Sequence, residues 1–241
     1  VLVDSGSTDA TLQIAEQFGC RIVHIKKEDF SFGRSLNVGC DAAKGEALVF
    51  VSGHCIPFDK HWIARLVAPL GHDRVAYTYG GQVGDLNTHF SERQIFAKYF
   101  PAESKVPQEG FYCNNANSAL LRCEWELARF DEEITGLEDM FLAKSLVQRG
   151  RKLAYVADAK VYHLHDETWP QVRRRFEREA IALQRIMPEV HLGPLDVARY
   201  AASAILLDIG AALQERSFRR HFTDIVIYRV CQFWGAYKGN H

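Results

Sequence analysis

Polar residues follow directly after short apolar, β-branched stretches at two places in this chain. Residues 1–3 (VLV) lead into residues 4–9 (DSGSTD), and residues 47–51 (ALVFV) lead into the polar residues SGH that follow. A third polar block, TGLED, comes at residues 135–139. In an open α/β sheet, ligands bind at the carboxyl ends of the strands. The order of the three blocks therefore predicts an α/β sheet with a ligand site along one edge.

Strand-like and helical stretches alternate along most of the chain. Strands are predicted at residues 1–3, 21–25, 47–51, 75–79, 117–122, 152–156 and 160–163, and Gly80-Gly81 is expected to break the chain. Helices are predicted at residues 12–18, 35–43, 58–70, 92–99 and 138–149, and again from about residue 169. This alternation implies a mainly parallel sheet flanked by helices. We expect a sheet domain at residues 1–168 and a helical C-terminal extension at residues 169–241.

The first strand begins at Val1 and reads as the interior of a sheet rather than its edge. We therefore expect a strand and a helix to precede it in the complete protein.

The charge balance excludes a general attraction to nucleic acid, because 29 Lys and Arg residues nearly cancel 30 Asp and Glu residues. Six cysteines are scattered without a CxxC pair, which favours a reducing compartment. The longest apolar stretch, residues 201–213, is interrupted by Asp208 and is shorter than the roughly 20 residues that span a bilayer. These features predict a cytoplasmic chain.

Several short motifs occur in a fixed order. They are VDSGSTD at residues 3–9, FGRSLNVG at 32–39, AKGE at 43–46, NNAN at 114–117, ED at 138–139, HLH at 163–165, YR at 228–229 and QFWGAYKG at 232–239. Together they resemble the inverting family 2 glycosyltransferases with the GT-A fold, and within them the bacterial rhamnosyltransferase-like branch. The resemblance runs nearly end to end, although members of that family begin with a strand and a helix that this chain lacks.

The resemblance implies a substrate and a reaction. We expect transfer of a sugar from a nucleoside diphosphate sugar, dTDP- or UDP-linked, with inversion at the anomeric carbon. The acceptor is expected to be a glycan or a polyprenyl-linked glycan in surface polysaccharide synthesis.

Asp4, Ser5 and Gly6 are the first candidate donor-binding residues. A carboxylate after a strand can accept a hydrogen bond from a nucleobase imide, and small neighbours let the base approach closely. The alternative is that Asp4 caps the following helix, although Ser7 and Asp9 suit that role better.

Arg34 and Asn37 are further donor-binding candidates, on a glycine-containing segment that should face the same edge of the sheet. Arginine suits bidentate contact with phosphate. A solvated arginine at the start of a helix is the alternative.

Ser52, Gly53 and His54 stand where many family members carry an Asp-x-Asp motif that holds a divalent metal on the diphosphate. His54 is a candidate ligand for Mn²⁺ or, less suitably, Mg²⁺, with His165 as a second ligand, since imidazole suits transition metals better than Mg²⁺. His54 could instead donate a hydrogen bond to the phosphates without a metal, or be a structural histidine. His163 shares a strand face with His165, so the pair could bind a metal or the diphosphate, and structural packing is the alternative for His163.

Glu138 and Asp139 are the candidate catalytic residues. The resemblance implies that Asp139 is the base that takes the proton from the acceptor hydroxyl, while Glu138, Asn115 and Asn117 contact the acceptor. The alternative for the two carboxylates is stabilisation of a helix N-terminus, worth about 0.3–1 kcal/mol.

Arginines and aromatic residues accumulate after residue 168, with arginines at 173, 174, 175, 178, 216, 219 and 220. They fit a surface that rests on anionic lipid headgroups, peripheral to the inner face of the cell membrane. Packing of helices on the core would use the same aromatic residues, and a charge run is often a solvated face.

Two other functions remain open from the sequence. A nucleotidyltransferase would use a similar sheet but needs carboxylate-held Mg²⁺ and a basic, glycine-rich loop, which are not evident here. A nucleotide-sugar-binding domain that has lost catalysis would explain the missing Asp-x-Asp motif, but it would not need Glu138 and Asp139.

Overall fold

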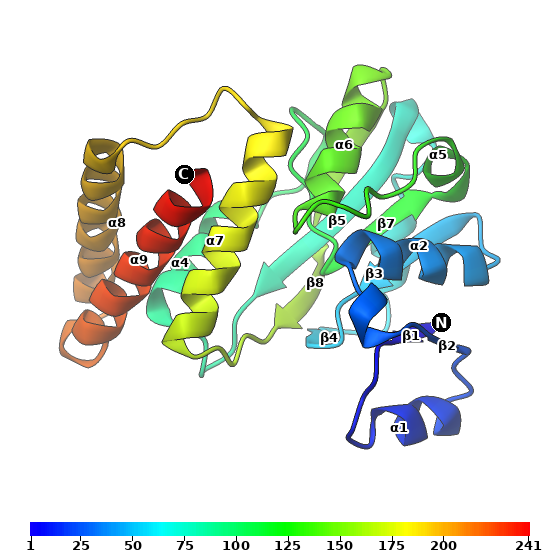
Figure 1. Cartoon of the computed structure of the whole chain (residues 1–241), viewed down its shortest axis with the longest axis horizontal. Coiled ribbons are helices and arrows are strands. Elements are labelled where there is room, and N and C mark those ends of the chain that lie inside the picture. The colour runs from blue at the N-terminus through cyan, green and yellow to red at the C-terminus, as the bar shows by residue number, and fades with distance from the viewer.

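The computed structural model describes all 241 residues and has an α/β architecture with helices on both sides of a central sheet (Figure 1). The strands are β1 (Leu2–Asp4), β2 (Ile22–His24), β3 (Ala47–Val51), β4 (Cys55–Pro57), β5 (Val75–Val83), β6 (Lys105–Gln108), β7 (Asn117–Leu121) and β8 (Lys152–His163). The α-helices are α1 (Thr11–Gln17), α2 (Phe32–Ala42), α3 (Trp62–Val67), α4 (Phe90–Tyr99), α5 (Arg122–Leu127), α6 (Glu138–Gln148), α7 (Trp169–Ile186), α8 (Pro194–Gln214) and α9 (Phe218–Asn240).

The main sheet is mixed rather than mainly parallel. Its strand order is β3-β7-β5-β8-β4, with β6 also paired to β8, and β1 and β2 form a separate two-stranded sheet. Only the β1–β2 and β5–β8 pairs are parallel, whereas the other four pairs are antiparallel. The α/β class predicted from the alternation is correct. The antiparallel pairs arise because β7 inserts between β3 and β5, and because β4 and β6 are short strands that the alternation does not reveal.

Alternating side chains on the strands divide the core into two layers. On one face, Tyr77, Leu120 and Tyr155 pack with residues of α2, α4, α5 and α6. On the other face, Ala119 and Val161 pack against α3. The sheet is therefore covered on both faces, as an α/β fold requires.

Gly80 and Gly81 lie inside β5 instead of ending it. A Cβ atom on Gly80 would lie 2.1 Å from the carbonyl oxygen of Ala159, and one on Gly81 would lie 2.7 Å from that of Ala157. The two glycines are needed for the close approach of β8, which continues as a single strand through a register shift at this point. The predicted break is therefore wrong.

The C-terminal helices form one layer at the left of Figure 1, and the predicted boundary at residue 168 falls directly before α7. Helix α9 packs closely on α7, where a Cβ atom on Gly239 would lie 2.1 Å from the carbonyl oxygen of Glu177. A buried ion pair, 2.7 Å between Arg229 Nε and Asp208 Oδ2, joins α9 to α8. Ser91 of α4 donates to the same carboxylate at 2.6 Å. The extension is thus anchored to the sheet domain through α4.

None of the helices combines the length and the apolar character that crossing a membrane would require.

Candidate active site

Three histidines gather where β3 and β8 end. His54 lies in the turn between β3 and β4, His163 is the last residue of β8, and His165 follows two residues later. Strand β4 pairs with the end of β8 and sets Cys55 opposite His163, which brings His54 alongside. Nε2 of His54 lies 2.8 Å from Nε2 of His163, and one ring nitrogen from each of the three histidines lies within 4.8 Å of the others.

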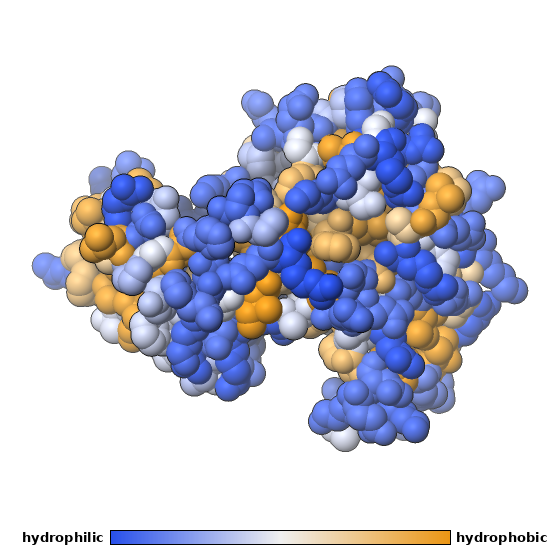
Figure 2. All heavy atoms as spheres, turned by 45° about the horizontal axis from the view of Figure 1, so that its top comes forward, coloured by the Kyte–Doolittle hydropathy of each residue, from blue (hydrophilic) through white to orange (hydrophobic).

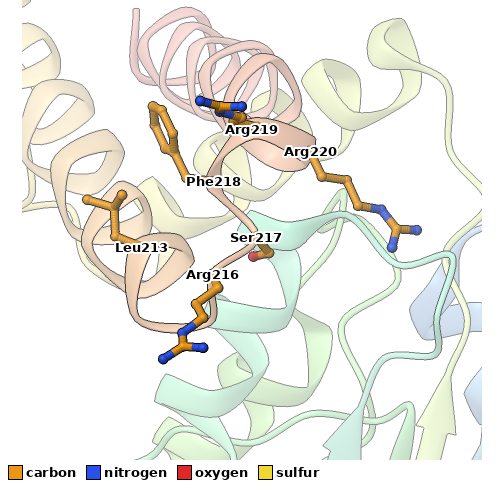
Figure 3. Close-up of a pocket in the computed structure, with 6 residues that line it drawn as sticks. All are labelled: Leu213, Arg216, Ser217, Phe218, Arg219 and Arg220. Carbon is orange, nitrogen blue, oxygen red and sulfur yellow. The ribbon is translucent and has the colours of Figure 1, made fainter.

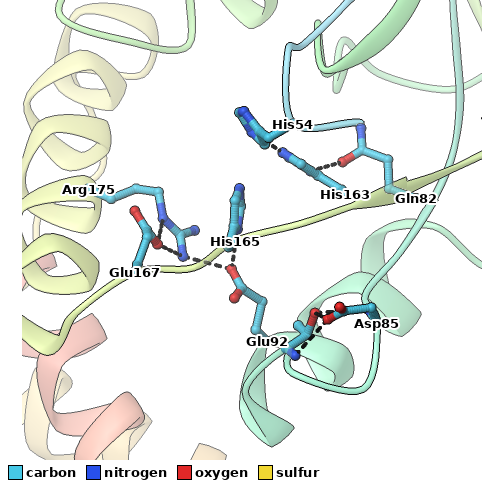
Figure 4. Close-up of polar contacts among 9 residues, drawn as sticks. His54, Gln82, Asp85, Glu92, His163, His165, Glu167 and Arg175 are labelled. Atoms are coloured by element: carbon cyan, nitrogen blue, oxygen red, sulfur yellow. Dashed lines mark hydrogen bonds and ion pairs between the residues drawn. The ribbon is translucent and has the colours of Figure 1, made fainter. Parts of the chain in front are cut away.

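Hydrogen bonds around His163 determine which of its nitrogens carries a proton (Figure 4). The N–H of Ala116 donates to Oδ1 of Asn114 at 3.0 Å, and Nε2 of Gln82 donates to the same oxygen at 2.9 Å. The carboxamide oxygen of Gln82 therefore faces Nδ1 of His163, at 2.7 Å, so Nδ1 must donate. This leaves a lone pair on Nε2 of His163, directed toward His54.

His165 is oriented by a buried carboxylate. Its Nδ1 donates to Oε1 of Glu92 at 2.7 Å, and Arg175 of α7 pairs with that same oxygen at 2.7 Å and with Glu167 at 2.7 Å (Figure 4). Burial opposes ionisation of Glu92, but the hydrogen bond from His165 and the charge of Arg175 hold its pKa below the ordinary value. The arrangement fixes the ring of His165 and leaves its Nε2 free to bind another group.

The three imidazoles fit a divalent transition metal. Burial lowers the pKa of His54, and burial together with the charges of His165 and His54 lowers the pKa of His163 to about 2. The Nδ1 atoms of His163 and His165 donate to an amide and to a carboxylate, which is the usual arrangement of histidine ligands. The set contains no carboxylate that would favour Mg²⁺ over Mn²⁺.

Glu138 and Asp139 open α6, and both are buried. The N–H groups of Asn115 and Met140 donate to the two oxygens of Asp139, each at 2.7 Å. Burial, and then the charge of Glu138, raise the pKa of Asp139, and burial raises that of Glu138. The residue before the pair, Leu137, has a left-handed backbone with φ 55°. A carboxyl group with a raised pKa beside a strained residue is typical of a catalytic base.

The residues Asn114 and Asn115 connect this carboxylate to the histidines. The backbone of Asn115 binds Asp139, while the side chain of Asn114 binds Gln82, which in turn binds His163. One run of main chain and hydrogen bonds thus positions Asp139 and His163 relative to each other.

Asp4 ends β1 and organises the turn after it. Its carboxylate accepts from the N–H of Gly6 at 2.9 Å, from the N–H of Ser7 at 3.1 Å and from the Ser7 hydroxyl at 2.5 Å. The Ser7 hydroxyl and then the Gly6 N–H lower the pKa of Asp4 to about 2, so it stays ionised. Ser7 therefore serves Asp4 and does not cap α1, whose N-cap is Ala10. Base recognition by Asp4, Ser5 and Gly6 stays a prediction.

Arg34 and Asn37 have different surroundings on α2. Arg34 is exposed, and its guanidinium has no hydrogen-bond partner or carboxylate in the structure. Asn37 is buried, donates to Phe130 and Glu132, and accepts from the indole of Trp125 at 3.0 Å. Its carboxamide is fully used inside the protein, so we leave Asn37 out of the donor site proposed below.

Asn115 and Asn117 are both buried. Nδ2 of Asn117 donates to the carbonyl oxygens of Gly81 and Ala159, which holds β5 and β8 together. The side-chain oxygen of Asn115 accepts from Ser118 at 2.7 Å. Both side chains brace the sheet around Asp139, and direct contact with an acceptor stays a prediction.

The sequence model of the family described as Glycosyl transferase family 2 matches residues 1–127, which is more than half of the chain. The chain belongs to this family.

Two curated proteins are similar to this family 2 chain, each in an alignment of 191 residues that covers 74% of the chain. They are the O-antigen chain rhamnosyltransferases RfbN of Salmonella typhimurium, at 28% identity, and WbaN of Salmonella anatum, at 27%. The chain covers 60% and 59% of their lengths. It thus spans less than two thirds of these relatives.

Solved structures share the fold at low sequence identity. A mannosyltransferase from Pyrobaculum calidifontis, solved with GDP-Man and Mn²⁺, aligns with a TM-score of 0.63 at 17% identity, covering 96% of this chain and 76% of its own. TarS residues 1–349 from S. aureus align with a TM-score of 0.51 at 16% identity, covering 95% and 79%. The GT-A fold expected from the motifs is confirmed.

Sequence reasoning missed several supports of this family 2 site. Gln82 is a polar residue in an otherwise apolar strand, which is a signal that could have been read. Glu92 and Arg175 gave no local signal, because their pairing joins α4 to α7 across 83 residues. The N-cap of α7 is Thr168, and Glu167 just before it pairs with Arg175.

Proposed function

We propose that this chain transfers a sugar from a nucleoside diphosphate sugar to a glycan or polyprenyl-linked acceptor, with inversion at the anomeric carbon. The observation that carries the proposal is the hydrogen-bonded connection between Asp139 and His163, beside which His54 and His165 lie. It holds a base and a diphosphate site in one rigid frame, as a displacement reaction needs. Family membership favours this activity over nucleotidyl transfer.

Asp139 is the proposed base. The acceptor oxygen attacks the anomeric carbon while the bond to the diphosphate oxygen breaks on the opposite face, and the acceptor proton passes to the carboxylate of Asp139. The raised pKa strengthens this carboxylate as a base near neutral pH. Burial, and then the charge of Glu138, raise that pKa, and Glu138 is also the proposed contact to acceptor hydroxyl groups.

The histidines are the proposed diphosphate site. His54, His163 and His165 would hold a divalent metal, Mn²⁺ in preference to Mg²⁺, and such an ion would neutralise charge on the departing diphosphate. His163 joins the two histidines expected from the sequence because Gln82 leaves its Nε2 unprotonated. Arg34 and the turn at Asp4 are the proposed contacts to the phosphates and the base.

The relatives support a proposal for the donor and for the product. Both curated relatives are named as O-antigen chain rhamnosyltransferases, which supports a deoxyhexose donor, dTDP- or UDP-linked, and a surface polysaccharide as product. Thermal shift against dTDP-, UDP-, GDP- and CMP-sugars tests the donor class. A ligand at 100 times its Kd adds about 2.7 kcal/mol to the free energy of unfolding.

The decisive variant is Asp139→Asn. It should abolish transfer and leave the Kd for the donor nearly unchanged, because a base acts mainly in the transition state. The exposed Asp158 offers a matched control, Asp158→Asn, which should transfer at the wild-type rate. Transfer by Asp139→Asn within a few-fold of wild type would remove Asp139 from the mechanism.

A further inference from the structure

The outer face of α8 exposes mainly apolar side chains. Leu195, Leu206, Leu207 and Leu213 have 58–86% of their surface exposed, and Tyr200 has 43%. Four residues, Leu195, Ala202, Leu206 and Leu213, are separated in turn by seven, four and seven residues. At 100° per residue this spacing places them on one line along the helix. The line runs about 27 Å. Monomeric proteins rarely expose a continuous apolar stripe of this kind without a partner.

Both acidic residues of α8 already interact within the protein, so they do not add negative charge to this face. Asp208 lies in the buried ion pair with Arg229, and Asp196 accepts from the backbone N–H of Gly193 at 3.2 Å. Arg199 is the charged residue that remains exposed on the helix, and it forms no ion pair. The face is therefore apolar with a positive charge.

Positive charge increases where α8 turns into α9. An open hollow of about 400 Å³ lies there, and Figure 3 shows the residues that line it: Leu213, Arg216, Ser217, Phe218, Arg219 and Arg220. The three arginines lack a carboxylate within ion-pair distance. Apolar side chains thus lie directly beside three unpaired guanidinium groups, and Figure 2 shows apolar residues at the surface of this helical part of the molecule.

These arginines are unfavourable for the fold where they stand. Arg216 has a left-handed backbone, φ 55°, at a helix C-terminus where glycine is usually found. Arg219 and Arg220 lie in the first turn of α9, where the helix dipole disfavours positive charge. The stability of the helices does not explain these three arginines. A negatively charged binding partner outside the protein is the simplest reason for their presence.

We propose that this surface, the exposed face of α8 with the α8–α9 turn, docks on an anionic lipid bilayer. A straight apolar stripe suits the acyl-chain boundary, and the adjacent guanidinium groups suit lipid phosphates. A second copy of the chain fits less well, because two such faces would bring unpaired arginines together with few acids to neutralise them. The inference is independent of the proposed transfer reaction.

The basic surface that we propose includes fewer of the arginines than the sequence suggests. Arg175 of α7 is held in ion pairs with Glu92 and Glu167, and the guanidinium of Arg178 stacks on Phe32 at 4.8 Å. These two arginines of α7 therefore contact other residues of the protein and are not available to lipid. The surface that faces outward is that of α8 and the following turn.

The test is co-sedimentation with phosphatidylcholine vesicles that contain or lack phosphatidylglycerol. The wild-type chain should bind the anionic vesicles and bind less as salt is raised. Leu206→Glu with Leu207→Glu, and separately Arg219→Glu with Arg220→Glu, should each reduce binding at least tenfold, since each arginine near an anionic surface contributes about a fivefold factor. The second pair should not lower Tm, because acidic residues suit a helix N-terminus.

Matched controls are available elsewhere on the surface. Leu86→Glu, at a leucine 96% exposed, and Lys26→Glu with Lys27→Glu should leave vesicle binding unchanged. Arg216→Gly should raise Tm while it weakens binding, which separates docking from folding. A wild-type chain that stays in the supernatant with anionic vesicles would overturn the proposal. So would a dimer in solution that Leu206→Glu dissociates without any effect of lipid.

Discussion

The carboxamide of Gln82 lies 2.7 Å from Nδ1 of His163 and fixes the proton of that ring on the side away from His54. A residue of β5 thereby decides whether His163 presents a lone pair or an N–H to the proposed diphosphate site.

Replacing Gln82 should therefore change the affinity for a metal ion, although Gln82 itself is not a proposed ligand. Gln82→Met removes the acceptor at similar size, and we expect a 10- to 100-fold weaker Mn²⁺ affinity, which is about the effect of losing such a support. Gln82→Glu keeps an acceptor for Nδ1 and should retain most of the affinity. Titration calorimetry with Mn²⁺ in the presence of the nucleoside diphosphate measures both variants, and equal affinities for Met and Glu would contradict the assigned tautomer.

Metal dependence separates two roles of the histidines. If they are ligands, EDTA should reduce transfer severely, Mn²⁺ should restore it better than Mg²⁺, and His54→Ala should weaken the response to Mn²⁺. If they only donate to the diphosphate, His54→Ala should slow transfer while EDTA has no effect. Rates measured with metal-stripped enzyme decide between them, and full activity in EDTA would reject the metal.

The buried carboxyl of Asp139 should make stability depend on pH. Burial, with the charge of Glu138, raises its pKa to about 8, above an unfolded value near 4. The folded state then binds a proton that the unfolded state releases, so wild-type stability falls as pH rises between these values. Asp139→Asn removes this loss, and its stability relative to wild type should increase from pH 5 to pH 8, by at most about 4 kcal/mol at about 1.4 kcal/mol per pH unit. Urea unfolding at several pH values measures the difference, and a constant difference would contradict the raised pKa.

Alanine variants of Arg34 and Asn37 should differ in their effects: one should weaken donor binding and the other should lower the stability of the fold. Asn37→Ala leaves the indole of Trp125 and the N–H of Phe130 unpaired and should cost about 2–4 kcal/mol of unfolding free energy. Arg34→Ala should keep Tm and weaken donor binding, because its exposed guanidinium holds nothing in the fold. Thermal unfolding and donor titration of the two variants test this contrast. A weaker Kd for Asn37→Ala, measured below its Tm, would return Asn37 to the donor site.

Much of the fold could be predicted because its signals are local. Strand β3 begins and ends at the predicted residues, and α6 differs from its prediction by one residue at its end. The pairing of strands is not local. The residues at 55–57 and 105–108 carry no local pattern that predicts their pairing with β8. Gly80-Gly81 is typical of a break in a strand, and only the folded chain shows that the backbone of Ala159 packs against it.

The candidate site divides in the same way. Asp139 and the histidines are visible as motifs because their chemistry is carried by neighbours in sequence. The groups that set their protonation are remote: Gln82 is 81 residues from His163, and Asn115 is 24 residues from Asp139. A motif shows which side chains are present, whereas tautomers and pKa values depend on packing that only the folded chain supplies.

The ion pair of Arg175 with Glu92 has a consequence for exchange between relatives. Because α7 supplies the cation that balances the carboxylate behind His165, a chimera that takes its C-terminal helices from another transferase would inherit or lose that cation with them. Such a graft would leave Glu92 charged, buried and unbalanced unless α4 were transferred as well. Helix α4 and the helices after residue 168 therefore have to come from the same parent, and a recombination breakpoint that keeps the histidine site intact should lie before His54 rather than before α7.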